Sequence, residues 1–420
     1  MCAPFLMVTM TFDVRAHYER AVHANLRLWR QRLLTATAPV DRWQTQKEVV
    51  WQAVADGLAF AATQEAAAWL AIDTAVTIER WGVWAEWLPL LETAVTLNLP
   101  PDVKTHLLLV QGRTDFLNRS FDDAAHLQET ALALAEAHQF THLTALAHFH
   151  LTNTYLGSKA YAQARQHGAA ALRLLLPAPS TTLASLFNTL GLLELDTGDY
   201  AASEAQFQQS LALWAGLDQP TQMARACLNL GAVYQRQNRL ERTRACYELA
   251  YAVLATTASE VDKLKVLNGL GTLHFSLKEL PQAEAVFRSG VAAAQEMPAL
   301  FHLRGSLTHN LGNTLLALGQ WEESRFYLEK SIRLWQQAND EIEQANSIGT
   351  LAEWYEQRQE WATAVTHYDE ALALLETYPD HQWAQHLAAL FRAARENCIL
   401  SGPAPKTPSP GAPSSFPARN

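Results

Sequence analysis

The sequence LGLLELDTGDYAASEAQFQQSL, residues 190–211, decides the fold because its pattern returns along most of the chain. In this stretch Gly191 precedes Tyr200 by nine positions, and Ser210 and Leu211 follow ten and eleven positions later. Residues 230–251, LGAVYQRQNRLERTRACYELAY, repeat the arrangement 40 positions further on. A fixed period of this length predicts a repeat architecture.

Large residues mark this period along the chain. They are Trp84, Phe121, Tyr161, Tyr200, Leu240, Leu280, Trp321 and Trp361, spaced by 37, 40, 39, 40, 40, 41 and 40 residues. Nine positions before each of them stands a small residue or threonine: Ala75, Gly112, Thr152, Gly191, Gly231, Gly271, Gly312 and Ala352. Small side chains at fixed points let two antiparallel helices pack about 8–10 Å apart. Each unit is therefore predicted to be a helical hairpin, and the fold class is predicted to be all-α.

Turn-forming residues separate the predicted helices. Gly198, Asn238 and Gly319 are of the types that readily adopt the left-handed conformation at a helix end. Between two hairpins, Asp218-Gln219-Pro220 offers a capping side chain followed by a proline for the first helical turn.

The pattern resembles the tetratricopeptide repeat, with Leu190-Gly191 in the first helix, Tyr200 opening the second and Ser210-Leu211 following. The resemblance covers roughly residues 68–377. Its period near 40 and its Asn-Leu-Gly sequences are similar to those of Leu-Gly-Asn-repeat adaptors and of helical arms in bacterial signalling ATPases and regulators. It implies a right-handed α-solenoid of about eight hairpins.

Some positions depart from the template. Thr152 and Ala352 replace the glycine of the first helix, and Gln128 and Gly168 stand where other units carry an aromatic ring. We expect less regular packing in the repeats that contain Gln128 and Gly168.

Composition divides the chain into four predicted segments. Seven of the 13 tryptophans lie before residue 88. We interpret them as the core of an irregular cap; the alternative is an exposed docking patch. The Pro/Ser-rich end cannot bury enough apolar area to fold. The segments are a degenerate N-terminal cap (1–66), the solenoid (67–378), a capping helix (379–401) and a disordered tail (402–420).

Charge and cysteine usage limit the classes of partner and compartment. The formal net charge is −10, and no Lys/Arg run with interleaved aromatics occurs, so neither nucleic acid nor an anionic membrane is an expected partner. The four cysteines are far apart without a CxxC pair, which indicates reduced thiols and a cytoplasmic protein. The apolar start lacks a basic region and fails as a signal peptide, and Met1, Met7 and Met10 are alternative first residues.

Motifs for catalysis or cofactor binding are missing from the sequence. It contains no GxxxxGK[ST], HExxH or GxSxG, so we expect no enzymatic activity and no cofactor. The densest cluster of possible metal ligands is His138, His142, His148 and His150, but no single helix face presents three of them. We therefore expect no metal site.

The first helices of the hairpins are expected to line a concave groove that binds a protein or peptide segment. Counting the small residue of each unit as position 8, the family template places groove residues near positions 2, 5, 9, 12 and 13. The expected groove residues are Leu109, Arg113, Phe116, Phe149, Asn153, Asn188, Arg225, Arg236, Lys265, Asn268, Phe275, His309, Asn313 and Asn346.

Arg225 and Lys265 occupy the same template position in consecutive repeats, so we expect them about 8–10 Å apart. No acidic residue stands at template positions 2, 5 or 9 of either repeat to neutralise them. A ligand carboxylate is therefore expected between them, with Asn268 bonding the ligand's backbone and Arg236 at the far end of its helix. This arrangement resembles the carboxylate clamps of other tetratricopeptide proteins; the alternative is that both cations extend into an aqueous groove.

The favoured function is a non-enzymatic interaction scaffold or adaptor. The alternatives are a peptide-responsive sensor that changes superhelical shape, or a regulatory subunit of a separately encoded enzyme. The sequence leaves the partner, the pathway and the oligomeric state open.

Overall fold

The computed structural model describes residues 14–35, 46–81, 84–176, 178–255, 257, 259–297, 300–379 and 381–402. Within these ranges every regular element is an α-helix, which confirms the predicted all-α fold class. The alternative first residues and the predicted tail beyond residue 402 lie outside the described residues.

The chain divides into two compact units, residues 1–237 and 238–420. The described helices of the first unit are α1 (Val14–Thr35), α3 (Lys47–Leu58), α4 (Gln64–Trp81), α5 (Trp84–Thr96), α6 (Pro101–Leu117), α7 (Phe121–Ala137), α8 (Thr141–Gly157), α9 (Tyr161–Leu175), α10 (Thr181–Asp196), α11 (Tyr200–Gly216) and α12 (Pro220–Arg236). Those of the second unit are α13 (Leu240–Ala255), α14 (Glu260–Ser276), α15 (Leu280–Ala294), α16 (Phe301–Ala317), α17 (Trp321–Ala338), α18 (Glu341–Gln357), α19 (Trp361–Leu375) and α20 (Gln382–Ser401).

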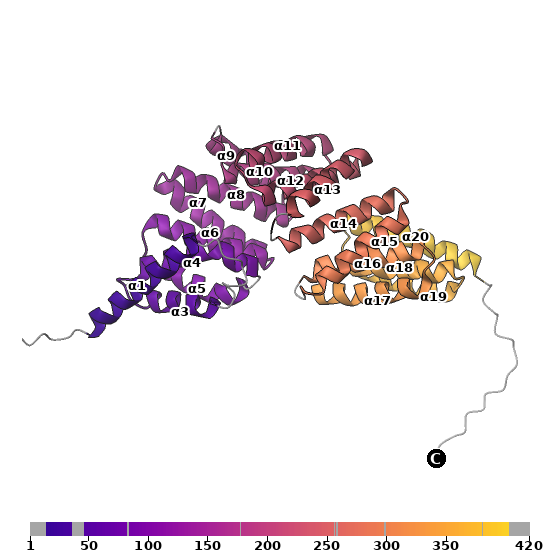
Figure 1. The fold of residues 1–420 in the computed structure, drawn as a ribbon, viewed down its shortest axis with the longest axis horizontal. Coiled ribbons are helices and arrows are strands. Elements are labelled where there is room, and N and C mark those ends of the chain that lie inside the picture. Colours follow the sequence, from indigo (N-terminus) through magenta and orange to yellow (C-terminus); the bar gives the residue numbers. More distant parts are fainter. Residues whose placement is uncertain are drawn as a thin grey trace, which may run out of the picture. The chain divides into compact units, whose positions relative to one another are not determined.

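Six of the predicted hairpins are confirmed. Each large residue that marks the period is the first residue of a helix, from Trp84 in α5 to Trp361 in α19. In the first unit α6 packs on α7, α8 on α9 and α10 on α11. In the second unit α14 packs on α15, α16 on α17 and α18 on α19, as Figure 1 shows. Each unit is therefore a stack of helical hairpins.

The small residues of the first helices lie where the two helices of a hairpin approach each other. A Cβ added at Gly191 would be 2.7 Å from Phe207 Cε1. The second helix contributes a small residue to the same contact, because Ser203 Oγ donates to the Gly191 carbonyl at 2.7 Å, and Ser324 Oγ donates to the Gly312 carbonyl at 2.8 Å. A larger side chain at either site would push the helices apart.

The turns between helices use the left-handed conformation, as the sequence predicts for Gly198, Asn238 and Gly319, whose φ angles are 84°, 56° and 72°. The prediction for Asp218 is wrong: Asp218 has a φ of 52°, and Gln219 is the N-cap residue, without a side-chain capping bond. Pro220 does begin α12. Other non-glycine residues in this conformation are Arg119, Gln139, Lys159, Lys278, Asn339 and Gln359.

The N-terminal tryptophans that the structure describes pack into the core of the first unit. Trp29 is 6% exposed and Trp87 1% exposed, and Trp51 and Trp69 pack against the same cluster. Core packing is thus the correct interpretation for these four. Trp43 and the side chains of Trp81 and Trp84 lie outside the described part of the chain.

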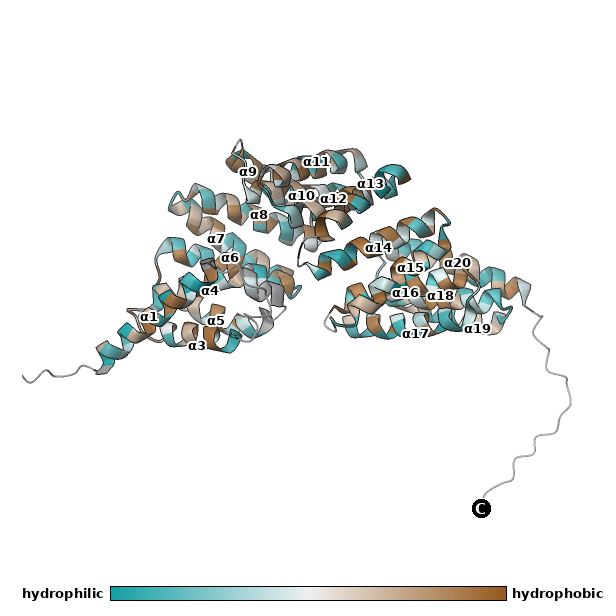
Figure 2. Ribbon diagram, viewed as in Figure 1, coloured by the Kyte–Doolittle hydropathy of each residue, from teal (hydrophilic) through white to brown (hydrophobic). Residues whose placement is uncertain are grey.

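Apolar and polar residues alternate along the helices of both units (Figure 2). None of the helices in the described ranges combines the length and the hydrophobicity that crossing a bilayer requires.

Candidate functional site

A hollow of about 320 Å³ opens on the first unit. The first helices of successive hairpins, α6, α8, α10 and α12, supply most of its lining, and α7 and α11 supply one residue each. The lining residues are Arg113, Phe116, Gln128, Phe149, His150, Asn153, Thr154, Ser185, Asn188, Thr189, Trp214, Gln222 and Arg225. The repeat therefore brings residues more than a hundred positions apart to one site.

Six of the predicted groove residues line this hollow: Arg113, Phe116, Phe149, Asn153, Asn188 and Arg225. Leu109 does not, because it is 2% exposed and packs in a cluster with Leu108, Ala131 and Ala147. Its expected exposure in a groove is therefore not what the structure shows.

Several lining residues were missed by the sequence reasoning. Ser185 stands at template position 2, so the template could have identified it as a groove residue. His150 and Thr189 stand at position 6, which is not one of the groove positions of the template. Trp214 belongs to a second helix, α11, so no rule restricted to first helices finds it.

The described lining of the hollow includes cationic side chains and no acidic ones. Among its described lining residues are two guanidinium groups, of Arg113 and Arg225, and no carboxylate. Burial, together with the nearby Arg113 guanidinium, lowers the pKa of His150 to about 3. His150 is therefore neutral at physiological pH and offers one donor and one acceptor nitrogen.

Amide side chains of the hollow bridge consecutive repeats. Asn153 Oδ1 accepts from Thr189 Oγ1 at 2.8 Å, and its Nδ2 donates to the Phe149 carbonyl at 3.0 Å. Asn188 Oδ1 accepts from Asn229 Nδ2 at 2.8 Å. On α12, Arg225 Nη1 lies 3.4 Å from Gln222 Oε1. These bonds hold polar groups in fixed positions around the hollow.

Gln128, expected to make its repeat pack less regularly, lies at the inner edge of the hollow. It is 1% exposed, and Thr154 Oγ1 donates to its Oε1 at 2.8 Å. A buried amide with a hydrogen-bond partner thus replaces the aromatic ring of other repeats.

In the second unit, predicted groove residues make bonds between repeats. Asn268 Oδ1 accepts from Asn310 Nδ2 at 2.9 Å, in the same template positions as Asn188 and Asn229. His309 is 8% exposed, so its expected exposure in a groove is not what the structure shows. Its Nδ1 lies 3.0 Å from Ser347 Oγ, and burial lowers the pKa of His309 to about 4.

The remaining predicted residues of the second unit have local partners. Asn346 Nδ2 donates to Glu343 Oε2 at 3.1 Å. Phe275 lies 5.7 Å from Lys278 Nζ, measured to the ring centroid. Binding roles for these two residues, and for Arg236 and Asn313, stay predictions.

The predicted clamp needs one correction. Lys265 Nζ lies 3.9 Å from Asp262 Oδ1, so a carboxylate from one turn earlier partly neutralises it. Asp262 does not stand at template position 2, 5 or 9, the positions at which a neutralising carboxylate was sought. Because Arg225 and Lys265 belong to different units, their spacing stays a prediction.

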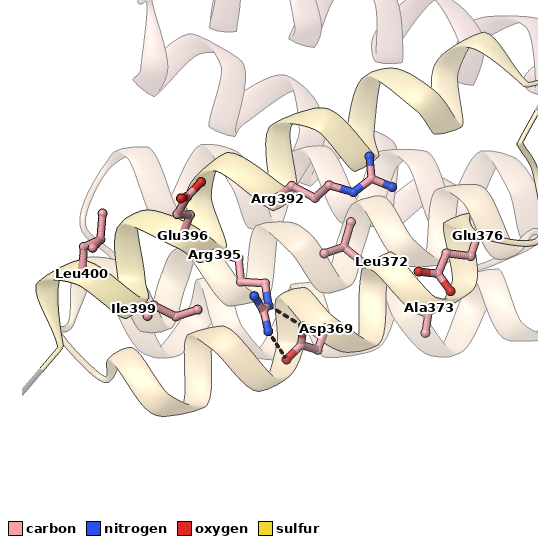
Figure 3. A pocket seen from close by; sticks show the side chains of 9 residues that line it. All are labelled: Asp369, Leu372, Ala373, Glu376, Arg392, Arg395, Glu396, Ile399 and Leu400. Carbon is pink, nitrogen blue, oxygen red and sulfur yellow. Dashed lines mark hydrogen bonds and ion pairs between the residues drawn. The ribbon is translucent and has the colours of Figure 1, made fainter. Parts of the chain in front are cut away.

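A second hollow, of about 550 Å³, lies between α19 and α20 (Figure 3). Charges of both signs line it, and Arg395 Nε bonds Asp369 Oδ1 at 2.5 Å beside it. No predicted groove residue lines this hollow. The hollow of the first unit is therefore the candidate binding site.

Comparison with known families connects these hairpins to a named repeat. The tetratricopeptide repeat matches residues 224–253 and 303–395. The chain contains tetratricopeptide repeats. The predicted resemblance to this repeat is thereby confirmed for these residues.

Solved structures share the fold at low sequence identity. The quorum sensor NprR from B. thuringiensis, in its apo form, has a TM-score of 0.58 and 15% identity, covering 85% of this chain and 99% of that one. A STAND protein with a tetratricopeptide repeat sensor from Pyrococcus horikoshii has a TM-score of 0.59 and 10% identity, covering 91% and 53%. A Rap protein complexed with competence and sporulation factor has a TM-score of 0.53 and 12% identity, covering 79% and 98%. Comparison with curated proteins by sequence gives no match.

Proposed function

We propose that this protein is a non-enzymatic interaction protein that holds an extended peptide, or a segment of a partner protein, in the hollow of the first unit. The observation that carries the proposal is the chemistry of the hollow. Its lining combines aromatic rings of Phe116, Phe149 and Trp214 with amides and two guanidinium groups, and none of the described lining side chains is acidic.

Each part of this lining suits a different part of a peptide. Aromatic rings contact apolar side chains, and side-chain amides at fixed positions bond the peptide backbone. Arginine binds carboxylates through two parallel hydrogen bonds. We therefore propose that the ligand carries a carboxylate, either of Asp or Glu or of a C-terminus, near Arg113 and Arg225.

The size of the hollow limits what it holds. At about 320 Å³ it lies at the small end of ligand sites, which range from about 300 to about 1,000 Å³. It therefore takes one or two residues of a longer segment, and the rest of the segment lies along the neighbouring first helices.

The similar structures support capture of a ligand by this fold. One is a quorum sensor, and another is a Rap protein in complex with a factor. They favour a sensor as the second candidate, in which ligand binding changes the shape of the chain and so alters a partner. X-ray scattering with and without a bound peptide separates this sensor from a passive scaffold, because only the sensor changes its radius of gyration.

The test of peptide binding uses two fluorescent hexapeptide libraries, one with free C-termini and one with C-terminal amides. We expect selected peptides to bind with micromolar affinity, and Arg113→Gln or Arg225→Gln to weaken binding about 10- to 100-fold, the range for a hydrogen bond to a charged group. Arg173→Gln is the matched control, since Arg173 is an exposed arginine of α9 that neither lines the hollow nor belongs to the predicted groove residues.

The outcomes are distinct. If neither library yields a ligand that Arg113→Gln or Arg225→Gln weakens, the proposed site is wrong. If peptides bind there but amidation and removal of Asp and Glu have no effect, the carboxylate is wrong and the peptide site stands. The double variant Arg225→Glu/Lys265→Glu tests the wider clamp, which requires a larger loss than Arg225→Glu alone.

We propose a cytoplasmic location, because the four cysteines are far apart in the sequence and form no CxxC pair, as is usual for proteins with reduced thiols. Cys227 and Cys398 are buried, and Cys246 is half-buried. Burial raises the pKa of Cys398 to about 11, so this thiol stays protonated and unreactive.

A further inference from the structure

The outer face of the last described helix, α20, carries an apolar stripe. Its inner face packs into the second unit through Ala384, Leu387, Ala388, Phe391 and Cys398. The exposed stripe consists of Trp383, His386, Leu390, Ala393, Asn397 and Leu400. Its two end residues lie beside neighbouring helices, since Leu400 also lines the hollow between α19 and α20, and Trp383 bonds Glu343 of α18.

The exposure of the large apolar members is high. Trp383 is 39% exposed, Leu390 51% and Leu400 77%. The helix that ends a repeat stack normally presents a polar outer face, because no further repeat covers it. In α20 the stripe contains no charged carboxylate, lysine or arginine, which is the composition of a contact surface.

The spacing of the stripe is that of a helix pair. Its members follow one another at intervals of three and four residues, 383, 386, 390, 393, 397 and 400. This is the alternation of the a and d positions of a coiled coil, which keeps one seam toward a partner helix. The asparagine at position 397 falls on an a position, where a polar residue selects one register.

We propose that α20 pairs antiparallel with α20 of a second copy of the chain, about a two-fold axis between Leu390 and Ala393. In such a pair, residues at equal distances from the axis face each other. Leu390 then meets Ala393 of the second copy, and Trp383 meets Leu400. Each layer joins a larger side chain to a smaller one.

The polar members of the stripe also match in this register. His386 and Asn397 are the two polar residues among the six, and the axis sets them opposite each other. Imidazole and amide side chains each offer a donor and an acceptor, so they can bond across the contact. In a parallel pair His386 would face His386, and large residues would face large ones.

Trp383 is held in place before any pairing. Its Nε1 donates to Glu343 Oε1 of α18 at 3.1 Å, and its ring stacks on His386 with 5.3 Å between centroids. A rigid tryptophan at the end of the stripe loses little conformational freedom on binding, as is typical of residues that dominate interface energies.

The chain's own C-terminal segment does not suit this helical contact. Residues 403–420 contain six prolines, at 403, 405, 408, 410, 413 and 417, and proline interrupts helices. A second copy of α20, by contrast, supplies a helix of equal length and complementary layers.

The length of the stripe sets the strength of the pair. Residues 383–400 span about 26 Å of helix. Two helices in contact over that length bury on the order of 800 Å² in total, less than the ~1,200 Å² at the low end of stable complexes. We therefore expect a weak, reversible dimer.

The experiment is sedimentation velocity of the full chain at concentrations from about 1 µM to about 300 µM, a range that brackets this weak association. We expect a monomer at the low end and a dimer at the high end. Leu390→Glu should raise the dissociation constant at least tenfold. Leu249→Glu on α13 should leave it unchanged, since Leu249 is 48% exposed and lies outside the stripe.

A charge exchange tests the antiparallel register. His386→Glu and Asn397→Arg should each weaken the dimer, and the double variant His386→Glu/Asn397→Arg should restore it through two ion pairs. A parallel pair would instead place like charges together in the double variant. Deletion of residues 403–420 should leave the dissociation constant unchanged.

Three results would overturn the proposal. The first is a monomer at every concentration, and the second is a dimer that Leu390→Glu does not weaken. The third is a dimer that strengthens when residues 403–420 are removed, because the C-terminal segment would then be the group that covers the stripe. A double variant that stays monomeric would overturn the antiparallel register. Melting temperatures equal to the parent's show that each variant is folded.

Discussion

Replacing Gly271 by alanine tests the helix packing directly, because the added Cβ meets a ring with no room to move. The Cβ would lie 2.6 Å from Phe287 Cζ and 2.7 Å from Cδ1, and closer still to Cε1. Carbon atoms in contact are normally about 3.5 to 4.0 Å apart, so the ring must retreat by about 1 Å. Phe287 is 1% exposed and packs in a cluster with Leu307 and Leu311.

The expected cost of this overpacking is about 1–3 kcal/mol. For a cooperative unit of 150–250 residues, 1 kcal/mol shifts the melting temperature by about 2–4 °C, so we expect a fall of roughly 2 to 12 °C. The assay is thermal unfolding followed by far-UV circular dichroism. Gly216→Ala is the control, because no atom lies within 4 Å of the Cβ it adds at the end of α11. It should be neutral or slightly stabilising.

A second substitution isolates the contact. Phe287→Leu removes the ring that Gly271→Ala strikes, so the double variant should lose less stability than the two single variants together. The reasoning is refuted if Gly271→Ala melts at the parent's temperature, as Gly216→Ala does. The close approach of α14 and α15 would then be absent from the protein in solution.

Three further changes have definite expected results. Burial lowers the pKa of His148 and His167, whose Nδ1 atoms lie 2.9 Å apart. The contribution of the two neutral rings to stability is therefore present above the unfolded pKa of 6.5 and is lost as pH falls through the folded pKa. His148→Asn should make the melting temperature less dependent on pH between the unfolded and the folded pKa. Thr154→Val leaves the buried Gln128 Oε1 without its donor and should lower the free energy of unfolding by about 1–3 kcal/mol, measured by urea denaturation. Deletion of residues 403–420 should leave the melting temperature unchanged, whereas a clear fall would contradict the composition-based prediction of a disordered tail.

The periodic part of the fold was predictable because close packing constrains residue size at every repeat. A glycine such as Gly191 is needed wherever a ring such as Phe207 fills the hairpin, and this requirement is visible in the sequence alone. The left-handed turn at Asp218 was not, since Asp suits both a helix cap and a left-handed turn. Only the neighbouring helix end shows which of the two it takes.

The binding hollow was predictable in part. The template finds residues on one face of a first helix, which is how Arg113, Asn153 and Arg225 were identified. It cannot state how deeply a neighbouring repeat covers that face, so Leu109 was expected at the surface. The template also does not identify counter-ions that stand outside its groove positions, such as Asp262 beside Lys265.

The left-handed turns have a consequence for how this protein can change over time. Lys159 and Gln359 adopt φ angles of 63° and 61°, which cost a side-chain-bearing residue about 1–2 kcal/mol relative to right-handed helix. Glycine removes that strain but raises the entropy of the unfolded chain by about 0.4–1 kcal/mol, so exchanges there shift stability in small steps. Neither residue lines the first-unit hollow. Mutations at the turns can therefore change the stability of single hairpins, while the binding selectivity of the hollow evolves separately.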